Sequence, residues 1–98
     1  MALNTNYIER KDLLSNASAT GSYFTVKGGT YIWSGEASFS GGSLQLQAKN
    51  ANGTATDIAG ATLTAAGFVS VLLAADAQVR VAVTGSPTAI YSSLVAVP

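Results

Sequence analysis

The chain contains neither cysteine nor histidine. Without cysteine it has no disulfide framework, no reactive thiol and no thiolate metal site. Without histidine it lacks the usual general base near neutral pH, the commonest metal ligand, and the central residue of Ser-His-Asp and Cys-His arrangements. These two absences predict that the protein is not an enzyme and has no catalytic, cofactor-binding or metal-binding residues.

Charged side chains are also scarce. Only 10% of the 98 residues are charged, against about 25% in an average soluble domain. Five Lys and Arg residues balance five Asp and Glu residues without any basic cluster. The sequence therefore lacks the basic patch expected of a nucleic-acid-binding protein. Two explanations of the low charge stay open. Ser, Thr, Asn, Gln and Gly supply the surface polarity, or much of the surface contacts other protein subunits.

The few carboxylates do not form a recognisable site. A glycosidase-like pair would need two of Glu36, Asp57 and Asp76 to lie roughly 5–10 Å apart across a cleft, and nothing in their spacing supports this. Gly28-Gly29 is not followed by a helical pattern that could bind phosphate. We therefore interpret these residues as parts of turns and strand edges, and expect no cofactor.

Long apolar runs are absent as well. No stretch approaches the roughly 18 uninterrupted apolar residues of a membrane helix. The start of the sequence, MALNTNYIERKDLL, lacks the basic and apolar regions of a signal peptide. We expect no membrane partner and synthesis in the cytoplasm.

From Gly21 onward the spacing of turn-forming residues is typical of an all-β domain. Turn signals recur every 8–12 residues or so, as in a sandwich or barrel of short strands. They fall at Gly28-Gly29, Gly41-Gly42, Asn52-Gly53, Gly60, Gly67, Asp76 and Gly85-Ser86-Pro87. The segments between them are Ser22–Val26, Thr30–Ala37, Ser43–Lys49, Thr54–Ile58, Ala61–Thr64, the two halves of Phe68–Val83, and Ala89–Val97. The pattern predicts a two-sheet antiparallel sandwich of jelly-roll or Greek-key type, with about eight short strands over residues 21–98.

The strongest alternation lies in Phe68–Val83, written FVSVLLAADAQVRVAV. Successive side chains of a strand point to opposite faces. One face therefore carries two apolar rows, Val69/Val71/Leu73 and Val79/Val81/Val83. The four residues around Asp76 predict a β-hairpin between the two halves. A fully buried Val or Leu is worth roughly 1.5–3 kcal/mol, so another part of the chain must cover this face.

Asn52-Gly53 is the strongest turn signal. Both central residues of a type I′ turn need positive φ, which Asn and Gly tolerate. The pair predicts a hairpin that joins the strand ending at Lys49 to Thr54–Ile58.

Residues 1–20 read as an N-terminal arm that is extended or forms a short helix from about Asn6 to Ser15. Such a helix is marginal in isolation. The arm is either a frayed terminus or a segment that orders against a neighbouring subunit.

Two aromatic residues, Tyr31 and Trp33, share one face of their strand. They either fill the core or, with Tyr23, lie on the surface, where they could stack on sugar rings or anchor a protein interface. The candidate partner-binding residues are Tyr7, Ile8, Leu13, Leu14, Tyr31 and Trp33.

The order of these signals, from about Gly21 to Val97, resembles small β-sandwich decoration (cement) proteins of tailed bacteriophages. The resemblance rests on Val26-Lys27-Gly28-Gly29 before Tyr31, Phe39 with Gly41-Gly42, Leu44 and Leu46, Asn52-Gly53-Thr54, Gly67 before Val69/Val71/Leu73, the Val79/Val81/Val83 row, and Ala89, Tyr91 and Leu94.

The resemblance implies a virion structural protein, usually a homotrimer, that sits on the capsid surface and stabilises it. Its partners would then be further copies of itself and the major capsid protein. Such families have no catalytic motif, so no functional residues carry over. The alternative is a carbohydrate- or receptor-binding module of a phage tail fibre or spike that uses Tyr23, Tyr31 and Trp33.

Overall fold

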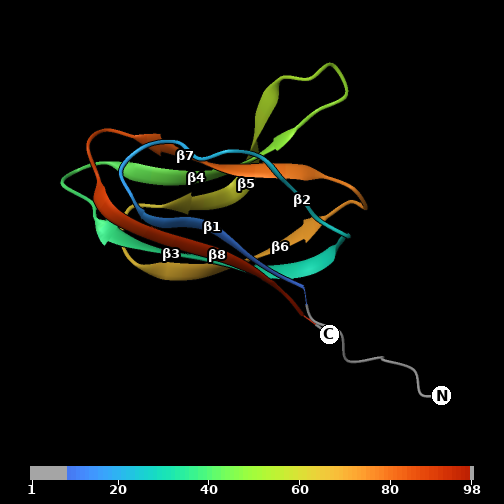
Figure 1. Ribbon diagram of the computed structural model, residues 1–98, viewed down its shortest axis with the longest axis horizontal. Coiled ribbons are helices and arrows are strands. Elements are labelled where there is room, and N and C mark those ends of the chain that lie inside the picture. The colour runs from blue at the N-terminus through green and yellow to red at the C-terminus, as the bar shows by residue number, and fades with distance from the viewer. Residues whose placement is uncertain (1–8, 98) are drawn as a thin grey trace.

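The computed structural model describes residues 9–97, and this part of the chain is all-β (Figure 1). Its eight strands are β1 (Arg10–Ala17), β2 (Phe24–Thr25), β3 (Gly29–Ser38), β4 (Ser43–Lys49), β5 (Ala55–Leu63), β6 (Gly67–Leu73), β7 (Gln78–Thr84) and β8 (Thr88–Ala96). No helix long and apolar enough to cross a bilayer occurs among these residues.

The strands form two antiparallel sheets with the orders β1-β8-β3-β6 and β2-β7-β4-β5. Strands pair from the outside of the sequence inward: β1 with β8, β2 with β7, β3 with β6 and β4 with β5. β8 also pairs with β3, and β7 with β4, which completes each sheet. This is the connectivity of a jelly roll. The predicted two-sheet sandwich is confirmed.

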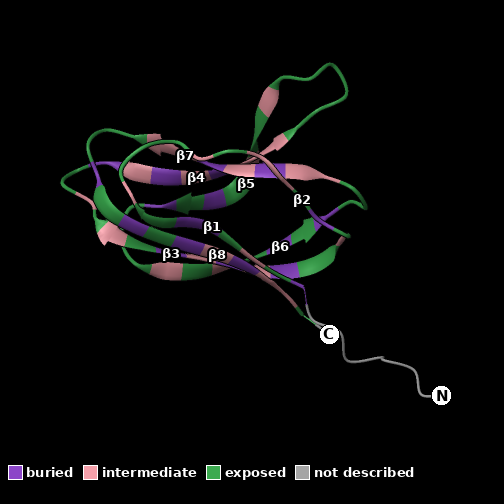
Figure 2. Ribbon diagram, viewed as in Figure 1, coloured by how far each residue is buried: buried purple, intermediate pink, exposed green. Residues whose placement is uncertain are grey.

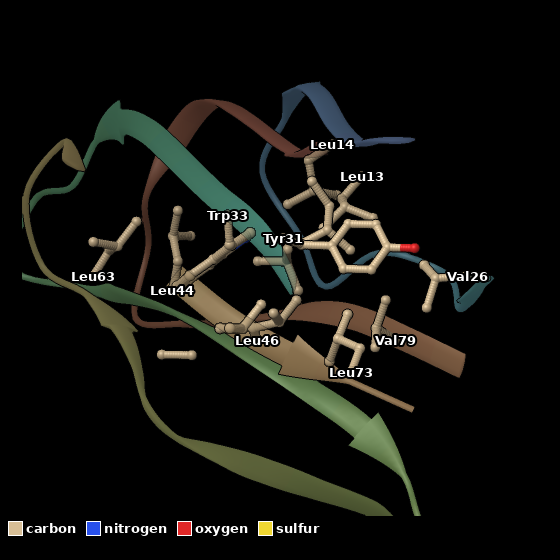
Figure 3. Packing of buried hydrophobic residues seen from close by; sticks show 14 of the residues in the cluster. Leu13, Leu14, Val26, Tyr31, Trp33, Leu44, Leu46, Leu63, Leu73 and Val79 are labelled. Carbon is tan, nitrogen blue, oxygen red and sulfur yellow. The ribbon is translucent and has the colours of Figure 1, made fainter. Parts of the chain in front are cut away.

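Alternate residues of the central strands fill the space between the sheets. Tyr31 and Trp33 of β3 face Leu44 and Leu46 of β4, and all four are fully buried (Figure 3). Figure 2 shows the resulting change between buried and exposed residues along the strands. Val71 and Leu73 of β6 and Val79 and Val81 of β7 are buried, as their alternation predicted.

The hairpin predicted over Phe68–Val83 is wrong, because β6 and β7 belong to different sheets. The connection at residues 74–77 crosses between the sheets through a turn in which Ala77 N–H donates to Ala74 O and Asp76 has a φ of 63°. The physical reason is the apolar rows themselves. Strands on opposite sides of the core bury their rows against each other, whereas a hairpin would leave both rows on one uncovered face.

The predicted β4–β5 hairpin is present, but its turn is not type I′. Of the central pair only Gly53 has a positive φ, of 89°. Gly53 N–H donates to Asn50 O at 2.9 Å, and Asn50 N–H donates to Thr54 O at 2.8 Å. These two bonds define a three-residue loop closed by a left-handed glycine bulge. Asn52 instead uses its side-chain oxygen to accept from Thr54 N–H at 3.1 Å. The end of this hairpin projects from the sandwich (Figure 1).

The two strands expected at Thr54–Ile58 and Ala61–Thr64 form one strand, β5. Gly60 does not break it, because a positive φ of 80° and a register shift opposite Gln45–Gln47 absorb the irregularity as a bulge. The strand expected at Ser22–Val26 shortens to β2.

The described part of the N-terminal arm contains β1, which pairs with β8 at one edge of the first sheet. The short helix considered for Asn6–Ser15 is therefore not formed over Arg10–Ser15. Between Asp12 and Leu14 the register with β8 shifts by one residue. Such a bulge turns two neighbouring side chains the same way, and Leu13 and Leu14 are both buried.

Candidate interaction face

The described residues that were predicted to bind a partner lie inside the sandwich. Tyr31 and Trp33 are 0% exposed, and Leu13 and Leu14 are buried beside them (Figure 3). Tyr7 and Ile8 lie outside the described residues. The buried rings have no free face for stacking on a sugar, so these four side chains pack the core, which was the other interpretation of the aromatic pair.

Tyr23, the third aromatic residue of that group, is half-buried at the surface of the second sheet. The Lys49 ammonium lies 4.4 Å from the centroid of its ring, and the Arg80 guanidinium carbon lies 5.0 Å from it. Cations at these distances are attracted to an aromatic ring. Two cationic side chains of this chain therefore already engage Tyr23.

A buried hydrogen-bond chain holds Trp33. Its indole N–H donates to Ser92 Oγ at 2.8 Å, and the Ser92 hydroxyl donates to Ser34 O at 2.7 Å. Ser92 is one of the two buried polar residues of the described chain. These two hydrogen bonds give the indole N–H an acceptor within the core, which a buried tryptophan requires.

The other buried polar residue is Glu9. Its carboxylate accepts from the Tyr31 hydroxyl and from Lys27 N–H at 2.9 Å, and Lys11 Nζ lies 3.8 Å away. Gly28 N–H donates to the Tyr31 hydroxyl at 3.2 Å. These bonds fasten the residue before β1 to the β2–β3 connection and to β3.

The surroundings of this pair shift both ionisations. Burial alone would raise the pKa of Glu9, but the bonds from Lys27 and Tyr31 and the charges of Lys11 and Lys27 together lower it. Burial, then the hydrogen bond to Glu9, raise the pKa of the Tyr31 hydroxyl. The surroundings thus hold the Glu9 carboxylate ionised and the Tyr31 phenol neutral.

The two outer faces of the sandwich differ sharply. On the second sheet, the outward side chains form polar contacts: Arg80 donates to Gln47 Oε1 at 3.0 Å, and Gln47 donates to Asp57 Oδ1 at 2.8 Å. Gln45 donates to Ile58 O at 3.0 Å and accepts from the Thr62 hydroxyl. This face is satisfied by its own hydrogen bonds.

On the first sheet, large apolar side chains point into solvent. Phe68 and Leu72 of β6 are each 79% exposed, Tyr91 of β8 is 47% exposed, and Val97, directly after β8, is 45% exposed. These four are all the large apolar residues that are exposed in the described chain. Half-buried Ile32 and Val95 lie opposite each other between them. We call this set, Ile32, Phe68, Leu72, Tyr91, Val95 and Val97, the apolar face.

A shallow cleft adjoins the apolar face on the same sheet. It has a volume of about 390 Å³ and is lined by Arg10, Asp12, Leu14, Ser15, Ser34, Gly35, Glu36, Ala66, Gly67, Phe68, Tyr91, Ser92 and Ser93. The hydroxyls of Ser34 and Ser93 are 2.9 Å apart, and an Arg10–Asp12 ion pair of 3.1 Å is exposed at its rim. The lining combines two aromatic rings with charged groups and hydroxyls.

The partner-binding prediction did not include Phe68 and Leu72. The alternation of β6 did place both on the face opposite Val69, Val71 and Leu73. The signal that could have identified them is their size, because two large apolar residues on the wetter side of one short strand are unusual in a free surface.

Comparison with protein-family models, curated proteins and solved structures gives no match to this chain. The resemblance to decoration proteins therefore rests on the order of sequence signals alone.

Proposed function

We propose that the protein is a virion structural protein that binds and stabilises the outside of a phage capsid, as decoration or cement proteins do. The observation that carries this proposal is the apolar face. Contiguous exposed apolar residues on a small domain typically mark a protein interface. The face lies on one side of a sandwich whose opposite side is polar, so the molecule has a side suited to docking and a side suited to water.

The energetics of a capsid surface suit such a face. Burial of apolar surface contributes roughly 25 cal/mol per Å², so one domain of this size supplies modest affinity by itself. A shell presents many symmetric sites, and modest contacts accumulate over all copies. The sequence resemblance and the jelly-roll architecture, which also occurs in viral capsid and lectin domains, point in the same direction.

Two measurements test the proposal. Particles of the phage that encodes the chain are purified by density gradient, and the chain is quantified against the major capsid protein by mass spectrometry. We expect a fixed ratio on the particle surface. Absence of the chain from purified particles would refute the proposal.

The second measurement is rebinding of purified chain to particles stripped of it. Tyr91→Lys places a charge on the apolar face two strands away from the β6 edge and should weaken binding at least about tenfold, equivalent to 1.4 kcal/mol. Thr84→Lys, on the exposed outer side of the second sheet, is the matched control and should bind like the wild type. Equal losses in both variants would show that the apolar face is not the contact.

The cleft favours a second function, a carbohydrate- or receptor-binding module. Tyr91 and Phe68 supply ring surfaces at its wall, and Glu36 and Asp12 supply acceptors for hydroxyl groups. A glycan array followed by titration calorimetry tests it. Binding of a glycan that Tyr91→Ala abolishes would support this function over capsid binding, and an array without any bound glycan would leave capsid binding as the better account.

A further inference from the structure

Three of the four sheet edges carry features that discourage pairing with another strand. β1 begins with Arg10, Lys11 and Asp12 and has two register shifts. β2 is only two residues long. β5 carries Asp57 and a bulge at Gly60. Charges, bulges and short length are the usual means of protecting an exposed edge.

The fourth edge, β6, has none of these features. Its sequence, GFVSVLL, contains no charged residue and no proline. All seven residues from Gly67 to Leu73 pair with Gly35 to Gly29 of β3 without a shift. Within the described residues no strand pairs with the other side of β6. A strand that is uncharged and regular in its pairing therefore presents a row of unpaired backbone N–H and C=O groups, which is a template for strand addition.

We propose that β6 pairs antiparallel with β6 of a second copy of this chain, about a two-fold axis at Ser70. Ser70 is the middle residue of β6, so this register is the one in which all seven residues of both strands overlap. It places Phe68 of each copy opposite Leu72 of the other on the outer face. On the core side it places Val69 opposite Val71 of the second copy.

The strand is therefore complementary to itself. Both outer pairs are aromatic with aliphatic, both inner pairs are valines, and only the two serines at the axis are polar. Apolar cross-strand pairs of this kind stabilise antiparallel sheets. Moving the two-fold axis by one residue, to Val69 or Val71, would set Phe68 or Leu72 opposite Ser70 and would leave two residues of each strand unpaired.

The pairing would join two four-stranded sheets into one eight-stranded sheet and would double the area of the apolar face. It is closed, because each copy uses its single unprotected edge and the contact is the same from both sides. It differs from the trimer that the sequence resemblance implies. It also does not depend on capsid binding, so either idea can fail while the other stands.

Cross-linking tests the register directly, since the chain contains no cysteine of its own. Directly opposed residues of an antiparallel pair have Cα atoms about 4.5–5.5 Å apart, within the range of roughly 4.4–6.8 Å that a disulfide spans. Under diamide oxidation, Ser70→Cys should give a covalent dimer. Phe68→Cys and Leu72→Cys should each give no covalent dimer when oxidised alone but should form one when mixed. Ser15→Cys on the β1 edge is the control and should not cross-link.

Sedimentation velocity tests the association without oxidation. The wild type should sediment as a dimer at micromolar concentration, and Ser70→Lys and Ser70→Glu should each sediment as monomers because like charges meet at the axis. An equimolar mixture of the two should recover the dimer, and Ser15→Lys should remain dimeric. Circular dichroism spectra that match the wild type would show that each variant is folded.

A wild type that is monomeric or trimeric would overturn the proposal. So would a Ser70→Lys variant that stays dimeric, or a mixture of Phe68→Cys and Leu72→Cys that fails to cross-link. Because Phe68 and Leu72 are each 79% exposed, their cysteine variants should fold, and the cross-linking result stands even if a charged variant at Ser70 does not fold.

Discussion

Replacing Ser92 by alanine is predicted to destabilise the protein through a residue that it does not change, Trp33. The indole N–H of Trp33 donates to Ser92 Oγ at 2.8 Å, and the Trp33 side chain is 0% exposed. Without the hydroxyl the indole donor keeps its position in the core but has no acceptor and no access to water. Ser34 O also loses the bond that the Ser92 hydroxyl donates at 2.7 Å.

The magnitude follows from these two losses. A buried donor left without a partner costs about 1–3 kcal/mol, and a lost hydrogen bond costs about 0.5–1.5 kcal/mol. We expect the free energy of unfolding to fall by about 2–3 kcal/mol. One kcal/mol shifts the Tm of a domain of this size by roughly 4–8 °C, so the Tm should fall by about 8–24 °C. With a typical stability of about 5–15 kcal/mol, the variant should still fold.

Urea denaturation of a double-mutant cycle with Trp33→Phe separates the two losses. Phenylalanine has no N–H donor, so Ser92→Ala in that background should cost only about 1 kcal/mol. Ser93→Ala is the matched control, because Ser93 points to the outer face and bonds Ser34 Oγ there. It should cost less than about 0.5 kcal/mol. An equal cost of Ser92→Ala in both backgrounds would refute the idea that the indole donor is the cause.

Three further predictions concern acid stability, a glycine turn and the apolar face. The pKa of Glu9 in the folded protein is below its ordinary value of 4.5. The stability that its ionised side chain gives to the fold is therefore complete above that value and is lost as the pH falls through the folded pKa. Glu9→Gln should therefore flatten the acid limb of stability measured by urea denaturation, whereas parallel acid limbs in the two proteins would contradict this. Gly28→Ala should destabilise the protein more than Gly29→Ala. Both positions have positive φ, but only at Gly28 would a Cβ meet backbone, 2.7 Å from Ala75. Thermal melts showing equal losses of stability in the two variants would argue against this close approach. Phe68→Ser should raise solubility in ammonium sulfate while changing the free energy of unfolding by less than about 0.5 kcal/mol, and a large loss of stability would mean that Phe68 packs within its own chain.

The sequence carried enough information for the faces of the strands but not for their partners. The alternation in Leu44/Leu46 and Val79/Val81 identified the buried side of two strands, because the two-residue period is a local property of extended backbone. For Tyr31/Trp33 it showed that the two rings share a face but left open whether that face is buried. Which strand lies beside which depends on contacts between residues far apart in the chain. Phe68–Val83 shows the difference. The alternation predicts the correct buried face for both halves. The predicted hairpin makes them neighbours in one sheet, whereas they lie in different sheets, across the core from each other.

Irregular backbone explains most of the other differences. Leu13-Leu14 breaks the alternation of a regular strand and follows a run of charged residues, so the segment was interpreted as an arm. A bulge accounts for the two adjacent buried leucines. Burial of Glu9 could not be anticipated, because it depends on Tyr31 and the backbone of Lys27, about 20 residues away.

The apolar face resolves a question that composition left open, namely why so little of this surface is charged. The low charge had two possible explanations, neutral polar side chains at the surface or contact with other subunits. Each explanation fits a different sheet. On the second sheet, Gln45 and Gln47 bond neighbouring groups and keep the surface polar with little charge. On the first, Phe68 and Leu72 stand in solvent without such compensation. Low charge alone therefore does not require a partner, whereas its combination with large exposed side chains and an unprotected edge at β6 is what the proposed contact with another subunit would explain. Any partner that leaves β6 and the apolar face in water would leave this combination unexplained.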